Sequence, residues 1–142
     1  MNETRLGIGA KVLIGTIVIA AGWLLFSEWR KTARVDELAA LPPCELAARY
    51  AAWRLAFEDQ HAGVEPTGSA AEEFEQQNEL FESAARRARE SNDSRVLEEL
   101  ENITAVDSEP WIRQRGDLSP FVQVMLADCP DEVEALMQDN QR

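Results

Sequence analysis

An apolar run of 21 residues near the amino terminus, LGIGAKVLIGTIVIAAGWLLF (residues 6–26), most constrains what this chain can fold into. As an α-helix rising about 1.5 Å per residue it is about 31 Å long, which matches the roughly 30 Å hydrocarbon core of a bilayer. Lys11 is its single charge. A helix in a soluble protein would present a polar face to water, but residues 12–26 have no such face. Trp23 and Trp29 lie toward the far end, as in an aromatic belt. The run therefore predicts a membrane-spanning helix.

A cleaved signal peptide and a lipoprotein signal are the two competing interpretations. The residues after Phe26, SEWRKTAR, are bulky and charged and contain no small-x-small cleavage site. Cys44 lies far from the apolar run and follows Pro43, where a lipid-attachment cysteine needs a small residue. We therefore expect an uncleaved anchor, and the predicted organisation is an N-terminal tail (1–5), a transmembrane helix (6–26), a juxtamembrane linker (27–42) and an acidic helical domain (43–142).

Small residues form two stripes on the predicted anchor. Gly15 and Gly22 are seven residues apart and share one face, while Gly9, Thr16 and Ala20 form a second stripe. Small side chains let helices approach closely in lipid, so these positions are candidates for contact with a partner helix. The competing interpretation is that glycine is simply common in transmembrane helices.

Charge divides the chain unevenly. Residues 1–34 carry five basic and two acidic side chains, a net charge of +3, whereas residues 35–142 carry nine Arg against 24 Asp and Glu, a net charge of −15. A domain this negative repels phosphate backbones, so we expect no nucleic-acid partner. The ordinary role of such a surface is to keep the domain soluble.

The orientation of the anchor is left open by its flanking charges. Arg5 and Lys11 precede or begin the span, and Arg30, Lys31 and Arg34 follow it. Counted alone, this difference of one charge slightly favours a cytoplasmic C-terminal domain.

The only two cysteines favour the opposite orientation. Cys44 and Cys129 each lie beside a proline at a predicted helix start. Because disulfides persist in oxidising compartments, an isolated pair in such matching positions predicts one disulfide and a domain outside the cytoplasm. The alternatives are two buried, reduced cysteines, or a reactive thiolate at Cys44 whose pKa is lowered by the helix terminus.

Helical periodicity dominates the rest of the chain and predicts an all-α fold. Leu46, Tyr50, Trp53 and Phe57 recur at spacings of four, three and four, which places them on one helix face. Phe74 and Phe81 mark a face of the next helix, and we expect Trp53 and Phe57 to pack against them. Three charged residues lie off this stripe: Arg49, Arg54 and Glu58.

Capping signals predict where the later helices begin. Ser69 with Glu72 reads as a capping box, and Ser94 or Asp93 is expected to cap the following short helix. Residues 105–118 show no period and are expected to form a loop, after which Ser119 caps and Pro120 begins a further helix. No segment alternates as a strand would.

No motif in the sequence points to catalysis. The single histidine, His61, has no second ligand nearby for zinc. The acidic clusters EEFE (72–75) and EELE (98–101) lack the order of a calcium loop and are expected to be solvated helix faces. No phosphate-binding loop or nucleophile elbow is present, so we expect a non-enzyme without a cofactor, a metal or a catalytic residue.

The Ala-, Arg- and Glu-rich composition with only two Lys indicates a bacterial protein. With the features above, it predicts a non-catalytic accessory or scaffold subunit of a bacterial inner-membrane complex, with a periplasmic helical interaction domain closed by one disulfide. The expected partners are the membrane and a protein, either another subunit or a second copy. The alternative function is an inhibitor or immunity-type protein facing the periplasm, which would bind a basic target through its acidic domain.

Overall fold

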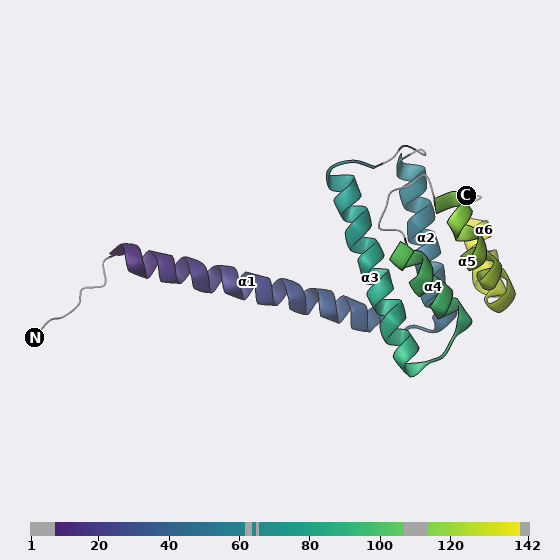
Figure 1. Ribbon diagram of the computed structural model, residues 1–142, viewed down its shortest axis with the longest axis horizontal. Coiled ribbons are helices and arrows are strands. Elements are labelled where there is room, and N and C mark those ends of the chain that lie inside the picture. The colour runs from purple at the N-terminus through teal and green to yellow at the C-terminus, as the bar shows by residue number, and fades with distance from the viewer. Residues whose placement is uncertain (1–7, 62–63, 65, 107–113, 140–142) are drawn as a thin grey trace, which may run out of the picture. The chain divides into compact units, whose positions relative to one another are not determined.

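The computed structural model describes the backbone of residues 8–61, 64, 66–106 and 114–139, and within these the side chains of 12–61, 64, 66–105 and 120–139. This part of the chain is helical and contains no strand, as predicted. Its helices are α1 (Ile8–Ala39), α2 (Pro43–His61), α3 (Ser69–Ser91), α4 (Arg95–Val106), α5 (Gln114–Asp128) and α6 (Pro130–Asp139) (Figure 1). They form two compact units, the first ending at Ala33 and the second beginning at Arg34.

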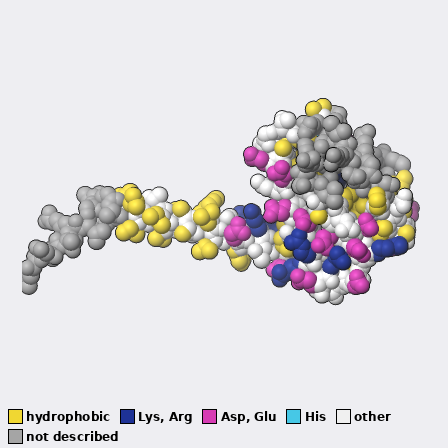
Figure 2. Space-filling view, in the orientation of Figure 1, with side chains coloured by type: hydrophobic (Ala, Val, Ile, Leu, Met, Phe, Trp, Pro, Cys, Tyr) yellow, Lys and Arg dark blue, Asp and Glu magenta, His cyan; other side chains and the backbone are white. Residues whose placement is uncertain are grey.

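The first unit is the apolar part of α1, the one described helix that is long and apolar enough to cross a membrane. Every side chain from Val12 to Phe26 is exposed, and hydrophobic side chains line the helix in Figure 2. Helix α1 continues through most of the predicted juxtamembrane linker to Ala39. The helix ends where the Ala40 N–H bonds to the Asp36 carbonyl at 3.1 Å, two residues before the prolines that cannot extend it.

The second unit is a helical bundle around one apolar core. Helices α3 and α4 pack along each other, and α4 also contacts α2 and α5, while α6 packs against α2 and α5. Tyr50 of α2 lies at the centre, with its ring 5.4 Å from that of Phe81 and 5.7 Å from that of Phe121. The core therefore joins α2, α3 and α5 through aromatic edges, a favoured geometry for aromatic pairs.

The predicted core residues all lie in this bundle. Leu46, Tyr50, Phe57, Phe74 and Phe81 are buried. Trp53 is half-buried, and its ring centroid is 5.4 Å from that of Phe74 and 5.7 Å from that of Phe81.

The predicted capping box at the start of α3 does not form. Gly68 is the N-cap residue, and the helix start has no side-chain capping hydrogen bond. Gly68 adopts a φ of 60°, a conformation that costs glycine little, and its carbonyl accepts the Glu72 N–H at 3.2 Å. Ser69 is consequently the first residue inside the helix, so its hydroxyl is not in the capping position.

The predicted helix start at Ser119 and Pro120 is also wrong. Helix α5 begins at Gln114 and contains Pro120 in its interior, so the expected loop is replaced by helix from Gln114 onward. Ala105 and Val106 of that expected loop belong to α4, and residues 107–113 lie outside the described residues. Proline is best tolerated in the first turn, which is why the sequence favoured the later start. Among the residues of α5 whose side chains the structure describes (120–128), Phe121 and Met125 are buried.

Candidate functional site

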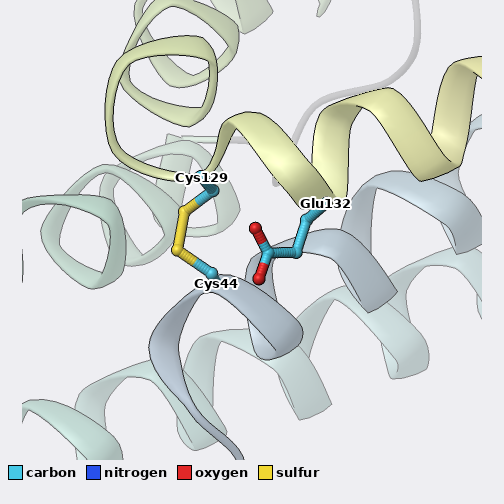
Figure 3. Close-up of side chains that lie close together, drawn as sticks. All are labelled: Cys44, Cys129 and Glu132. Carbon is cyan, nitrogen blue, oxygen red and sulfur yellow. A yellow bond between two sulfur atoms is a disulfide. The ribbon is translucent and has the colours of Figure 1, made fainter.

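A disulfide joins Cys44, in the first turn of α2, to Cys129, which lies between α5 and α6 (Figure 3). The sulfur atoms are 2.00 Å apart and the Cα atoms 5.5 Å apart, a separation that disulfides commonly span. Cys129 is 1% exposed, whereas Cys44 is half-buried. Cys129 takes its place because its N–H bonds to the Met125 carbonyl and its own carbonyl accepts the Val133 N–H. The bond thus ties the first helix of the bundle to the last two.

Glu132 points its carboxylate toward this disulfide from the first turn of α6 (Figure 3). A carboxylate oxygen and the two sulfur atoms all lie within 4.8 Å of one another. Two thiolates and a carboxylate at this spacing would suit a metal ion. Sulfur atoms bonded to each other are not thiolates, however, so this cluster offers no metal site while the disulfide is closed.

An ion pair holds the end of α5 next to the disulfide. Arg95, the first residue of α4, donates from its terminal nitrogen to Asp128 at 2.7 Å and from Nε to the other carboxylate oxygen at 3.2 Å. The pKa of Arg95 is raised, first by this hydrogen bond and then by the Asp128 charge. These two hydrogen bonds hold Asp128, the residue before Cys129. The Cys44 sulfur lies 3.5 Å from the Asp128 carbonyl oxygen.

Arg54 lies off the predicted apolar stripe of α2, yet it is only 2% exposed. Its Nε donates to Glu58 at 3.3 Å and a terminal nitrogen donates to the Tyr50 hydroxyl at 3.2 Å. Its guanidinium carbon also lies 4.9 Å from the centroid of the Phe74 ring. A buried guanidinium is tolerated when hydrogen bonds and an aromatic face replace water. The i, i+4 spacing of Tyr50, Arg54 and Glu58 was the sequence signal that could have indicated these contacts of Arg54.

The small residues predicted for helix contact have open surroundings. A Cβ added at Gly15 or Gly22 would meet nothing within 4 Å, and Ala20 is exposed. The Thr16 hydroxyl bonds to the Val12 carbonyl at 2.9 Å. Gly9 belongs to α1, but its surroundings lie outside the described residues.

The other polar candidates have structural partners. His61 stacks on Phe57, with ring centroids 4.2 Å apart, and its Nδ1 lies 2.8 Å from the Phe57 carbonyl. In the first acidic cluster the glutamates are exposed around buried Phe74. In the second, Glu101 pairs with Arg89 at 2.6 Å and with Arg86 at 3.6 Å.

Two adjoining hollows lie on the side of the bundle formed by α2 and α6. The first is an open groove of about 580 Å³ between these helices, and its lining includes Ala48, Ala52, Ala135 and Leu136. The second is a pocket of about 200 Å³, whose apolar walls come from α2, α5 and α6 and include Leu55, Val122 and Met137. Leu136 borders both hollows. The sequence stripes identified core faces and gave no sign of these hollows, since they depend on how three helices meet.

Comparisons with protein-family models, with curated proteins and with solved structures found no match to this chain.

Proposed function

We propose that this is a single-pass protein of a bacterial inner membrane whose helical domain lies in the periplasm and holds a partner protein at the membrane. In this role it is a non-catalytic accessory or scaffold subunit of a membrane complex. The observation that carries the proposal is the Cys44–Cys129 disulfide, because such bonds persist in oxidising compartments. The exposed apolar helix from Val12 to Phe26 supplies the anchor.

A binding role is favoured over catalysis because the side chains best suited to chemistry, those of Cys, His and buried Arg, make structural contacts. Both cysteines are consumed in the disulfide, and His61 is stacked on Phe57. Arg54 lies inside the core against Tyr50 and Glu58. Each of these groups therefore stabilises the bundle, whereas the open groove beside α6 offers a surface to a partner.

The second candidate function is an inhibitor or immunity-type protein that neutralises a basic target. The net charge of −15 on residues 35–142 favours it. Binding that depends on charge attraction weakens as ionic strength rises. Deletion of residues 1–30 should abolish partner capture that depends on the apolar anchor and spare an inhibitor, so this deletion separates the two functions.

The location of the domain can be tested by alkylating thiols in intact bacteria that express the full chain. Cells are denatured without reductant in the presence of a maleimide that adds mass, and the protein is detected by gel shift. We expect no shift before reduction and two added groups after it. The variants Cys44→Ser and Cys129→Ser should each gain one group without reduction. Two free thiols in the wild-type chain would overturn the proposed location.

Orientation is checked independently by reporters fused after Arg142. We expect alkaline phosphatase to be active there and a cytoplasmic reporter to be inactive. The partner is then sought by affinity purification from gently solubilised membranes at two salt concentrations. Recovery of the chain alone under both conditions, with a periplasmic domain, would contradict the scaffold role and leave the location standing.

A further inference from the structure

We infer that the groove between α2 and α6 binds the apolar face of a cationic amphipathic helix from a partner protein. This inference rests on the proposed binding function and adds the surface and the chemistry of the partner.

The groove suits a helix because three of its lining side chains are small. Ala48 and Ala52 lie one turn apart on α2, and Ala135 lies on α6. Alanines at these positions let a third helix approach α2 and α6 closely. The groove has a volume of about 580 Å³ and is open to solvent, as a docking groove requires.

The adjoining pocket provides a place for one anchoring side chain. Its volume of about 200 Å³ is smaller than the roughly 300–1,000 Å³ typical of small-molecule sites. Leu55, Val122 and Met137 at this pocket are 40%, 45% and 61% exposed, so apolar surface is still open to water. A large apolar side chain inserted here would act as the buried anchor that interfaces commonly use.

The charges around the groove determine which helix fits. Arg49 is already paired with Glu45 at 3.0 Å. Glu132 and Asp139 line the same groove, and neither forms an ion pair with any residue for which the structure gives side chains. Helix α6 as a whole carries four acidic residues and no basic one. A partner helix with Lys or Arg beside its apolar stripe would neutralise these carboxylates. A neutral partner helix would remove water from the carboxylates without supplying an opposite charge, which is unfavourable.

The same charges disfavour the other possible occupants. Lipid headgroups carry phosphates, which the carboxylates repel. A second copy of this domain would bring another net charge of −15 to the surface. The occupant of the groove is therefore a basic helical segment of a different protein.

The test uses two synthetic helical peptides of 18 residues with the same Leu/Ala apolar face, one with Lys and one with Glu on its polar face. Binding to the full-length protein in neutral detergent is measured by fluorescence anisotropy. We expect the Lys peptide to bind more tightly by about tenfold or more, which corresponds to about 1.4 kcal/mol.

Two groove variants and two matched controls locate the binding. Ala52→Trp places a large side chain in the groove from an exposed lining position, and the double variant Glu132→Gln with Asp139→Asn removes the unpaired charges. Each should weaken binding of the Lys peptide by roughly tenfold. The controls make equivalent changes at exposed positions of α3: Gln76→Trp, and Glu72→Gln with Glu73→Gln.

Controls that change binding by less than about twofold would support the groove. If the α3 charge control weakens binding as much as the groove variant does, the attraction is non-specific and the inference is overturned. Full binding by Ala52→Trp overturns it as well. Neither result alters the thiol, reporter or purification outcomes, so the groove and the proposed function can fail separately.

Discussion

Asn78 of α3 donates a hydrogen bond from its side-chain nitrogen to the backbone oxygen of Thr104, at 2.7 Å. Thr104 lies in the last turn of α4, where carbonyls have no partner within their own helix. Asn78 is 5% exposed and Thr104 is 2% exposed, so water does not replace this bond easily. The amide of one helix thus caps the end of its neighbour.

The variant Asn78→Ala should lower the free energy of unfolding by about 1–3 kcal/mol, because it leaves a buried carbonyl without a donor. Urea unfolding of the full chain in detergent, followed by far-UV circular dichroism, measures the change. Asn102→Ala, at an exposed position of α4, is the control and should shift stability by less than about 0.5 kcal/mol. Equal effects of the two variants would mean that the cap contributes little.

Removal of Arg54 should destabilise the bundle far more than removal of its neighbour Arg49. Arg54→Ala deletes a buried guanidinium with its bonds to Tyr50 and Glu58, and we expect a loss of about 3–5 kcal/mol. Arg49→Ala removes an exposed ion pair with Glu45 and should cost less than about 1 kcal/mol.

Arg54→Met separates the packing of the Arg54 side chain from its charge. Both Arg54→Met and Arg54→Ala remove the bonds to Tyr50 and Glu58, but methionine keeps most of the side-chain volume in the core. We expect Arg54→Met to be less destabilised than Arg54→Ala in the same urea unfolding, because it leaves a smaller cavity. A methionine variant as unstable as the alanine variant would show that the lost hydrogen bonds and charge account for the whole effect.

Opening the disulfide should weaken the bundle without changing its fold. The bond spans 85 positions of sequence, which the chain-entropy model values at about 4–5 kcal/mol. The double variant Cys44→Ser with Cys129→Ser should unfold at a lower urea concentration than wild type. Added reductant should lower the wild-type midpoint and leave that of the double variant unchanged. A reductant effect on the double variant would contradict this account.

Glu132 should slow reduction of the disulfide. A thiolate reductant attacks most easily at half-buried Cys44, which makes the buried Cys129 sulfur the leaving group. The nearby carboxylate repels the incoming thiolate and destabilises the departing one.

Glu132→Gln should therefore be reduced several-fold faster by glutathione, on the order of threefold to tenfold. Reduction is followed by the mass shift of alkylated thiols at fixed pH. Glu134→Gln, which removes the same charge from an exposed position of α6, should react at nearly the wild-type rate. A rate unchanged by Glu132→Gln would show that burial alone protects the bond.

The parts of this fold that the sequence predicted depend on strong local signals. The apolar run had only one plausible structure, and two cysteines allow only one intramolecular pairing, so the helical class and the Cys44–Cys129 bond were both predicted correctly.

The features that the sequence did not predict depend on contacts between helices, which can override the preferences of residues within one helix. The position of Arg54 follows from Phe74 on another helix, which no spacing within α2 reveals. Pro120 fits a helix start by itself, yet α5 begins earlier at Gln114. The groove likewise requires the relative placement of α2 and α6, which no single helix encodes.

The position of the disulfide also sets an order of events when the domain is made. Cys44 is synthesised long before Cys129, since 85 positions separate them. During that interval the earlier cysteine lacks its correct partner. Contacts between sequence neighbours α3 and α4 can form in the meantime, whereas α6 can dock on α2 only after Cys129 has emerged. Covalent closure is thus a late step, and the unpaired Cys44 is the point at which a wrong bond to another protein would form.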